Sequence, residues 1–253
     1  MRQRRVTGIE ERLEPYADLI LRGTAGTGAF RDLVGREKDK SAESPRLPAS
    51  GVKHPRWYQR PSPRYELPEG FGHIYAEFGC GRGLFINAMA EADPEGLYVG
   101  IEGCKTIVIR GLEKTRAKGL SNVRYIDDFI NDAVAAFGTE TLSGVFLNFS
   151  DPWPKDRHAD RRLTAPKKAE AYYRTLTPGG FVSFKTDGEK FFTYSLAAFS
   201  EAGFQIAGAA CDIATAVPLA GPAERAALTP TEYELKFRAE NKPIYRFTAI
   251  KKV

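Results

Sequence analysis

The residues best suited to chemistry lie at positions 148–163, in the run NFSDPWPKDRHADRRL. The short apolar run before them, 145–147, predicts a buried strand. Pro152 and Pro154 prevent that strand from continuing, and they also prevent a helix, so we expect Asp151 to be held in a stiff loop where the strand ends. Ligands of open parallel sheets bind outside the carboxyl ends of the strands, and the loop is therefore predicted to border a binding site.

Positive charge follows this carboxylate. Positions 155–168 hold six basic and two acidic residues, and Trp153 stands just before them. An acid beside an aromatic ring, followed by cations, suits a purine base attached to a phosphate chain. The alternative is a surface loop in which the tryptophan packs and the charges are solvated. The predicted phosphate contacts are Lys155, Arg157, Arg161 and Arg162.

A second candidate site is the run EFGCGRG at positions 77–83, between a predicted strand and a predicted helix. Gly79, Gly81 and Gly83 allow a tight turn and the close approach of a ligand to the backbone. Their G-x-G-x-G spacing differs from the G-x-G-x-x-G of dinucleotide-binding proteins.

Three carboxylates indicate the nature of the ligand. Glu77 would repel the pyrophosphate of a dinucleotide but would attract ammonium and sulfonium groups, so we predict S-adenosylmethionine rather than NAD as the cofactor. Glu102 ends the next predicted strand and can accept hydrogen bonds from ribose hydroxyls. Asp132 follows the third predicted strand and can supply a carboxylate near the adenine. The alternative role for Asp132 is a charge at a helix N-terminus.

The composition of the chain limits the possible domain size, partners and cellular setting. The chain has 253 residues, 42% of them hydrophobic, which is enough for one large domain, and its net charge of +5 favours a polyanionic partner. Three scattered cysteines and three distant histidines indicate neither a disulfide framework nor a metal site. We found no signal peptide and no run of membrane-spanning length, so the expected setting is cytoplasmic, without membrane contact. The sequence implies no obligatory protein partner and leaves the oligomeric state open.

From position 73 onwards, strand and helix patterns alternate. This order predicts βαβ units, and hence an α/β fold with a doubly wound, mostly parallel Rossmann-like sheet and an antiparallel last strand. Predicted helices span 83–92, 104–118, 128–137, 164–176 and 189–202, and a Gly/Pro/Ala-rich connection covers about 212–230. Predicted strands span 73–78, 97–102, 122–126, 144–149, 181–186, 204–210 and 243–252.

We divide the chain into a basic, partly irregular N-terminal extension, residues 1–70, and a catalytic domain, residues 71–253. A helix is predicted at 9–22, and prolines exclude regular structure in the stretch before position 70. Trp57, Tyr58 and Tyr65 lie among basic residues there and could stack on RNA bases. The alternative is an extension that wraps around the core.

Several motifs occur in one order along the chain: EFGCGRG, Glu102, NDA at 131–133, DPWPKDRH with RRL, KTD at 185–187 and TEYE at 231–234. Together they resemble the tRNA (guanine-N7-)-methyltransferase family in its bacterial single-chain form, over about residues 73–253. The resemblance implies transfer of a methyl group from S-adenosylmethionine to N7 of a guanosine in the variable loop of tRNA. Ser150 and Asp156 depart from the usual family pattern, and Asp156 removes a positive charge near the RNA.

The resemblance also implies roles for individual residues. Asp151 is associated with catalysis as well as with the methyl donor. The other residues that it associates with the donor are Glu77, Glu102 and Asp132. Those that it associates with the substrate are Lys155, Asp187, Thr231, Tyr233 and Glu234.

The chemistry of guanine is consistent with these roles. N7 carries a lone pair and no proton, so the methyl transfer needs alignment and exclusion of water rather than deprotonation. The N1–H and N2–H groups of guanine need acceptors, for which Asp187 and Glu234 are the acidic candidates. Two alternatives stay open, a methyltransferase that acts on an exocyclic base amine and a non-catalytic RNA-binding module that retains the cofactor pocket. Glu77 disfavours a dehydrogenase.

Overall fold

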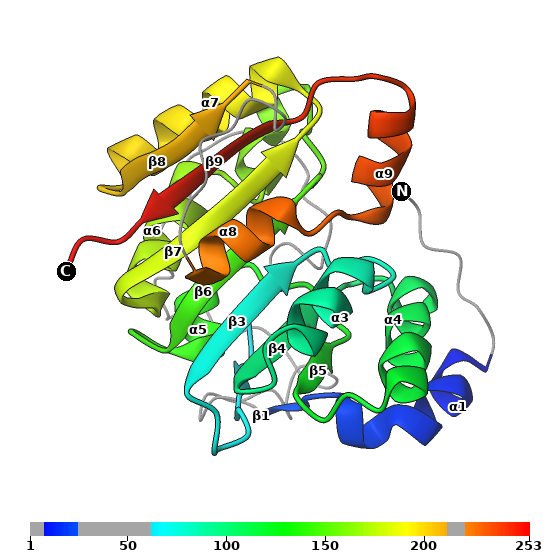
Figure 1. Ribbon diagram of the computed structural model, residues 1–253. Helices are drawn as coiled ribbons and strands as arrows, with labels where there is room; N and C mark the ends of the chain where they lie inside the picture. Colours follow the sequence, from blue (N-terminus) through cyan, green and yellow to red (C-terminus); the bar gives the residue numbers. More distant parts are fainter. Residues whose placement is uncertain (1–7, 25–61, 212–220) are drawn as a thin grey trace, which may run out of the picture.

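A seven-stranded sheet forms the centre of the molecule (Figure 1). The computed structural model describes residues 8–24, 62–211 and 221–253. The order of the strands is β5-β4-β3-β6-β7-β9-β8, and β9 runs antiparallel to both of its neighbours while β3 to β7 are parallel. The predicted fold class is therefore confirmed. The strands are β3 (His73–Phe78), β4 (Gly96–Ile101), β5 (Val123–Ile126), β6 (Leu142–Asn148), β7 (Leu176–Thr186), β8 (Gln205–Ala210) and β9 (Tyr245–Ile250).

Helices cover both faces of this sheet, because successive side chains of a strand point to opposite faces. Ala76 and Phe78 of β3 pack in one buried cluster, and Tyr75, just before them, packs in the other. One face is covered by α5 (Ala133–Phe137), α6 (Pro166–Thr175) and α7 (Glu189–Glu201). The other is covered by α3 (Leu84–Glu91), α4 (Lys105–Lys118) and α8 (Gly221–Leu228).

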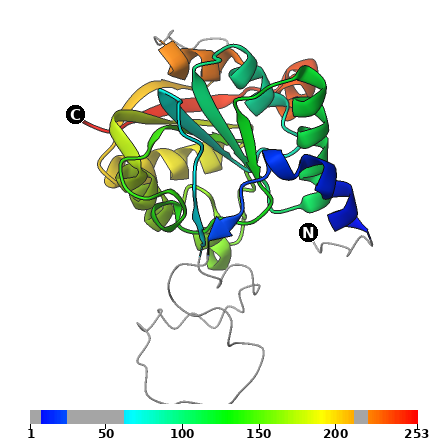
Figure 2. The same cartoon turned by 90° about the horizontal axis from the view of Figure 1, so that it is seen from below.

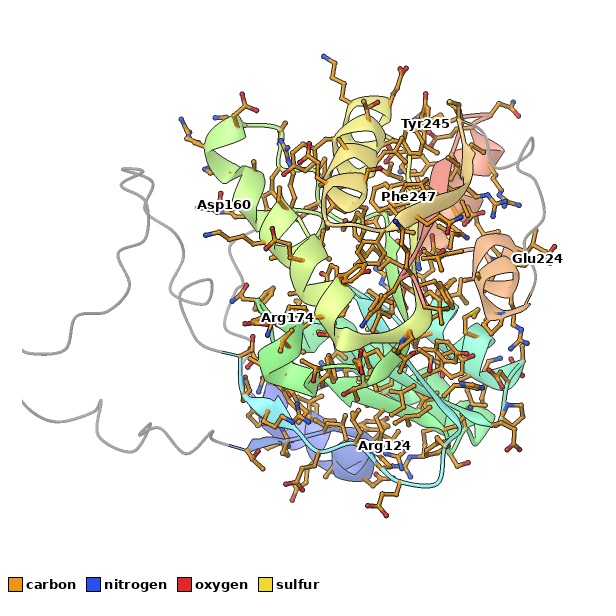
Figure 3. The ribbon with its side chains drawn as sticks, turned by 90° about the vertical axis from the view of Figure 1, so that its left-hand side faces the viewer. Arg124, Asp160, Arg174, Glu224, Tyr245 and Phe247 are labelled. Atoms are coloured by element: carbon orange, nitrogen blue, oxygen red, sulfur yellow. The ribbon has the colours of Figure 1, made fainter. Side chains whose placement is uncertain are left out.

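The antiparallel edge is stabilised by aromatic packing. Phe247 of β9, labelled in Figure 3, lies with its ring centroid 5.0 Å from that of Phe184 on β7 and 5.5 Å from that of Phe199 on α7. All three rings are buried, so β9 is attached to the sheet by apolar contacts as well as by its backbone ladder.

Some predicted boundaries differ from those observed. The helix expected at 128–137 begins only at Ala133, because the Asp132 side chain caps it. The segment 177–180, expected to stop a helix, already belongs to strand β7. Two helices were not predicted, α8 in the expected connection and α9 (Glu232–Ala239) after it. The motif Thr231-x-x-Glu234 is a capping-box sequence, which could have identified α9.

Part of the N-terminal extension packs on the α4 side of the sheet. Helix α1 (Ile9–Leu13) is followed by a 3-10 helix, Glu14–Leu19, instead of the single helix predicted for 9–22. Leu13 and Ile20 are buried in the same cluster as α3 and α4, and Figure 2 shows α1 lying beside α4. These described residues therefore wrap around the core.

Tyr65 is also part of the core. It lies in the two-residue strand β2 (Arg64–Tyr65), which pairs with β1 (Gly23–Thr24), and it is 4% exposed beside Phe137. The prediction that Tyr65 stacks on RNA is thus wrong, because its ring is covered by protein. Trp57 and Tyr58 lie outside the described residues.

Candidate functional site

The glycine-rich turn lies between β3 and α3, and its middle glycine, Gly81, borders open space. The Gly79 and Cys80 amides donate hydrogen bonds to the Ile101 carbonyl at 2.8 and 3.0 Å, which holds the turn against β4. Gly79 and Gly81 have φ of +81° and +55°, which favour glycine. A Cβ at Gly81 would meet nothing within 4 Å. A ligand can therefore approach the backbone here.

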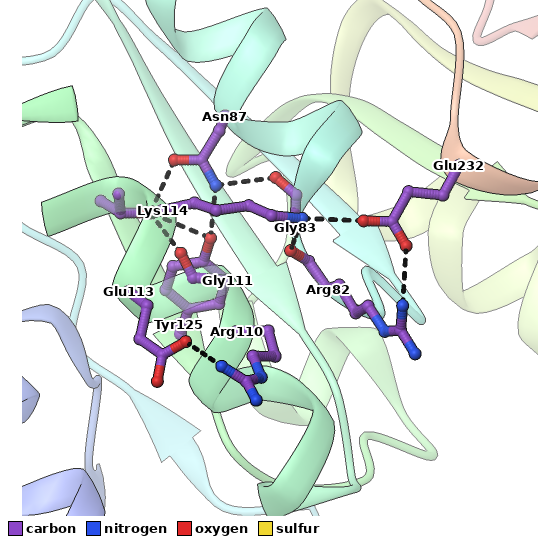
Figure 4. Close-up of polar contacts among 10 residues, drawn as sticks. Arg82, Gly83, Asn87, Arg110, Gly111, Glu113, Lys114, Tyr125 and Glu232 are labelled. Atoms are coloured by element: carbon purple, nitrogen blue, oxygen red, sulfur yellow. Dashed lines mark hydrogen bonds and ion pairs between the residues drawn. The ribbon is translucent and has the colours of Figure 1, made fainter. Parts of the chain in front are cut away.

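Gly83 has a different function, the packing of α3 on α4. A Cβ there would lie 2.7 Å from the Tyr125 hydroxyl and 2.8 Å from the Gly111 Cα. Asn87 of α3 links the turn to β5, since its Nδ2 donates to the Gly83 carbonyl at 2.7 Å and to the Tyr125 hydroxyl at 2.8 Å (Figure 4). Thr115 donates to Asn87 Oδ1 at 2.6 Å. This buried network of hydrogen bonds stabilises the glycine-rich turn.

Glu77 is buried at the carboxyl end of β3. It is 2% exposed, and its Oε1 accepts a hydrogen bond of 2.9 Å from Nδ2 of Asn148, the last residue of β6. Its Oε2 is buried with no hydrogen-bond partner among the described residues. Burial raises the pKa of Glu77 to about 8, and the Glu102 carboxylate adds to this shift. A buried carboxyl with an unused oxygen fits an incoming ammonium group.

Glu102 directly follows β4, and its side chain links the glycine-rich turn to the segment between β4 and α4. Its Oε2 accepts from the Gly81 amide at 3.2 Å, and its Oε1 accepts from the Cys104 amide at 2.8 Å. Burial raises the pKa of Glu102, and the nearby carboxylate of Asp151 raises it further. Because carboxylate oxygens accept more than one hydrogen bond each, Glu102 can still accept bonds from ribose hydroxyls.

Asp132 serves the helix that follows it. Its Oδ1 accepts from the amides of Val134 and Ala135 at 2.9 and 3.2 Å, so it is the N-cap of α5. This geometry matches the alternative considered for Asp132, a helix N-terminal charge.

The loop after β6 has a constrained backbone. Phe149 and Trp153 have φ of +48° and +40°, which is uncommon for residues other than glycine. Arg162 supports the loop, because its Nε donates to the Pro152 carbonyl at 2.8 Å and its guanidinium to the Trp153 carbonyl at 3.0 Å. It also lies over the Tyr194 ring, at 4.2 Å. Arg162 is thus buried beneath the loop, where its guanidinium binds protein carbonyls instead of being exposed for the predicted phosphate contact.

The outer surface of the loop carries the other predicted phosphate-binding residues. Lys155 and Arg157 are exposed, at the start of a 3-10 helix, Asp156–Arg161. Arg161 lies over the Trp153 ring, with its guanidinium carbon 5.1 Å from the ring centroid. Asp151 is exposed beside this surface.

The remaining predicted site residues lie at the start of helix α9 and just beyond β7. Thr231 Oγ1 accepts from the Glu234 amide at 3.0 Å and caps the helix. Glu234 is fully buried and pairs with Lys185 of β7, whose Nζ lies 3.0 Å from Glu234 Oε2, and with Arg238. The carboxylate of Glu234 is therefore engaged by protein cations. Asp187, just beyond β7, remains exposed.

Tyr233 presents an aromatic surface beside the loop. Its side chain is 63% exposed, and its ring is stacked 6.5 Å from Phe149 and 6.3 Å from Phe237. The two phenylalanines are themselves 5.8 Å apart. No sequence motif singles out Phe149 or Phe237, because the contact between them depends on the packing of α9 against the loop.

Helix α9 also contacts the glycine-rich turn. Lys114 of α4 donates to Glu232 Oε1 at 2.8 Å and to the Arg82 carbonyl at 3.0 Å, and Arg82 lies 3.7 Å from Glu232 (Figure 4). Helix α9 and the glycine-rich turn are thus connected by ion pairs.

The sheet topology explains why these residues meet. Chain order reverses at β3, which pairs with β4 on one side and with β6 on the other. Glu77 and Asn148 lie at this switch point, where ligands of open α/β sheets bind. Among the described residues, no group of three or more His, Cys, Asp and Glu side chains is placed to hold a metal ion, and no helix is long and apolar enough to cross a membrane.

Comparison with known proteins identifies close relatives. Residues 72–247 match a family model described as "Putative methyltransferase". The chain is 36% identical over 222 residues to the tRNA (guanine-N(7)-)-methyltransferase of Geobacillus kaustophilus, covering 85% of this chain and 93% of the relative. It is 36% identical to the protein of that name from Listeria monocytogenes serotype 4b, over 84% of this chain and 94% of the relative.

Solved structures share the fold. The 16S rRNA methyltransferase KamB is 15% identical, with a TM-score of 0.54 over 73% of this chain and 90% of that chain. An antibiotic-related methyltransferase is 19% identical, with a TM-score of 0.51 over 73% of this chain and 89% of that chain. At these identities the likeness concerns the arrangement of the sheet and helices.

Proposed function

Because the chain belongs to the tRNA (guanine-N(7)-)-methyltransferase family, we propose that it transfers a methyl group from S-adenosylmethionine to N7 of a guanosine in tRNA. Three carboxylates at one end of the site support this proposal independently of the relatives. The donor end of the site holds Glu77 with an unused buried oxygen, and Glu102 and Asp151 lie close enough for their charges to interact. These carboxylates fit a cationic donor and would repel a pyrophosphate.

The residues at the donor end have separate roles. S-adenosylmethionine, when bound, supplies an electrophilic methyl group on its sulfonium. Glu77 accepts hydrogen bonds from the ammonium of the donor, and Glu102 accepts them from its ribose hydroxyls. Gly81 leaves room for the donor beside the backbone. Asp132 supports the site indirectly by starting α5.

Asp151 lies between the donor end and the RNA end of the site. Guanine N7 has no proton to lose, so Asp151 orients the reactants and stabilises the positive charge that develops on the ring. Arg162 keeps this carboxylate in place, because it binds the carbonyls of the two residues after Asp151.

The RNA end combines stacking with hydrogen bonding. The exposed ring of Tyr233, supported by Phe149 and Phe237, offers a surface for an unstacked base. Asp187 is the exposed carboxylate that can accept from guanine N1–H and N2–H, since Glu234 is paired inside the protein. Lys155 and Arg157 contact phosphates, and they contribute affinity rather than base identity.

A single-turnover assay with tRNA and labelled S-adenosylmethionine tests this function. The labelled nucleoside should be N7-methylguanosine, and Asp151→Asn should slow the reaction about 10²–10³-fold, the scale of losing one preorganised polar group. Asp156→Asn is the matched control, because Asp156 is an exposed acid of the same loop, and its rate should stay close to wild type.

Proton transfer separates this function from its closest alternative. Methylation of N7 should show no solvent isotope effect in single turnover. An isotope effect in the wild type that Asp151→Asn abolishes, together with label on an exocyclic amine, would replace the proposal with an amino-group methyltransferase.

A further inference from the structure

Two loops at the carboxyl ends of the parallel strands, one after β4 and one after β5, are packed together as a unit. The backbone amide of Glu102 donates a hydrogen bond to the Ile126 carbonyl at 3.0 Å, so the start of the first loop is attached to the end of β5. The Phe129 ring of the second loop packs on Gly103 of the first, so closely that a Cβ on Gly103 would lie 2.3 Å from the ring. The position of Glu102 therefore depends on where the loop after β5 is held.

An ion pair also joins these two loops. Lys105 is the first residue of α4, at the end of the first loop, and Asp127 directly follows β5. The Lys105 Nζ lies 3.3 Å from Asp127 Oδ2, and the Asp127 side chain is only 9% exposed. A carboxylate that is mostly removed from water needs a cation beside it, so Lys105 holds the loop after β5 in place.

The N-terminal segment, residues 8–24, supplies two further charges at this position. Glu10 Oε1 of α1 lies 2.6 Å from Lys105 Nζ, and Arg22 Nη1 lies 3.5 Å from Asp127 Oδ1. The charges alternate in sign along the series Glu10, Lys105, Asp127 and Arg22, so each has an opposite charge next to it. We call these four residues the edge cluster. The cluster attaches both loops to the N-terminal segment.

The path of the segment explains how both of its ends reach the edge cluster. From α1 the segment follows α4 to the last turn of that helix, where Asp18 pairs with Arg116. It then returns along β5, where the Leu21 amide donates to the Tyr125 carbonyl at 2.8 Å and the bridge between the two stretches is parallel. A parallel course brings the next residue, Arg22, to the carboxyl end of β5.

We propose that Lys105 and Asp127, held by Glu10 and Arg22, are positioning residues for Glu102, so that the N-terminal segment takes part in binding the ribose of the methyl donor. This inference rests on the proposed function, in which Glu102 accepts hydrogen bonds from the ribose hydroxyls. Hydrogen bonds to a carboxylate are strong only at the right distance and angle. A shift of the two loops therefore weakens donor binding even though every residue that contacts the ribose is still present.

The alternative is a purely structural role for the edge cluster. Glu10 and Arg22 are 69% and 61% exposed, and ion pairs at such positions contribute little to stability. Their loss would then affect the donor no more than the loss of any other ion pair of the segment. The pair of Asp18 with Arg116 is the matched comparison, because it is similarly exposed and lies at the other end of α4.

Calorimetry with S-adenosylhomocysteine compares the two ends of α4 in the full chain. The double variant Glu10→Gln with Arg22→Gln should bind this ligand about three- to tenfold more weakly than wild type, within the range for residues coupled in one network. Asp18→Asn should bind it within about twofold of wild type. Equal losses in the two variants, or no loss in the double variant, would overturn the inference.

A second ligand locates the effect on the donor. 5′-Methylthioadenosine keeps the ribose but lacks the amino-acid end of S-adenosylhomocysteine. Because the edge cluster acts through the ribose, the double variant should weaken both ligands by the same factor. A loss confined to S-adenosylhomocysteine would contradict the inference.

A double-mutant cycle with Glu102 separates positioning from general destabilisation. Lys105→Met should weaken S-adenosylhomocysteine about three- to tenfold in wild type but less than about twofold in Glu102→Ala, because that variant has no ribose acceptor left to position. The same loss in both backgrounds would mean that Lys105 acts independently of Glu102, and the inference would fail.

Failure of this inference is distinguishable from failure of the proposed function. If Glu102→Ala weakens S-adenosylhomocysteine but the double variant binds like wild type, the inference fails and the function stands. If wild type binds neither S-adenosylhomocysteine nor 5′-methylthioadenosine, the proposed function itself fails.

Discussion

Affinity for the methyl donor should depend on pH through Glu77. Burial raises the pKa of this carboxyl to about 8, with Glu102 adding to the shift and Asn148 and Lys185 opposing it. At pH 7 the free protein therefore holds Glu77 protonated in about nine molecules of ten. Binding of an ammonium favours the carboxylate, so donor binding at this pH must release a proton.

The size of the effect follows from the two groups that form the pair. The α-amino group of a free amino acid stays protonated from pH 6 to pH 8, so affinity is proportional to the carboxylate fraction of Glu77, whose pKa is about 8. Affinity should rise about fiftyfold from pH 6 to pH 8, with about 0.9 proton released per ligand at pH 7.

Calorimetry of S-adenosylhomocysteine in buffers of different ionisation heat measures both quantities. Glu77→Gln removes the titrating group but keeps the shape, so its affinity should be lower and should not rise between pH 6 and pH 8. 5′-Methylthioadenosine should show no pH dependence with either protein. A wild-type affinity that is constant from pH 6 to pH 8, or a rise that persists in Glu77→Gln, would refute the reasoning.

Two further predictions concern charged residues with different surroundings. Arg157→Ala should weaken tRNA binding and reduce the salt dependence of the tRNA affinity by about one counterion, measured by filter binding at several salt concentrations. Arg162→Ala should mainly lower the melting temperature, because it removes the hydrogen bonds that support the loop. Glu234→Gln leaves Lys185 buried without its counter-charge and should cost about 3–5 kcal/mol in denaturant unfolding, and a loss below about 1 kcal/mol would contradict the structural role of this pair.

Local patterns were sufficient to predict much of the architecture. Alternating strand and helix signals identified the parallel sheet, since each buried strand is a short apolar run that needs no remote information to recognise. The turn at Gly79–Gly83 and the stop after β6 were predictable for the same reason, because glycine and proline restrict the backbone directly. Short helices such as α9 were missed, although its capping box is visible in the sequence.

The roles of charged residues in the site required the tertiary structure. Arg162 and Arg157 belong to one basic run, yet the first is buried by contacts with Pro152 and Tyr194 and the second is exposed. Glu234 has its counter-charge in Lys185, 49 positions earlier. A charge is buried when a partner from another part of the chain offsets its desolvation, and spacing along the sequence does not reveal that partner.

The same limit applies at the donor end. The sequence shows a carboxylate before a glycine-rich turn and an amide near the end of a later predicted strand. The pairing of β3 with β6 places Glu77 and Asn148, 71 positions apart, within 2.9 Å of each other. Strand order depends on how the whole sheet packs between its helices, so the structure alone showed that these two side chains form one site.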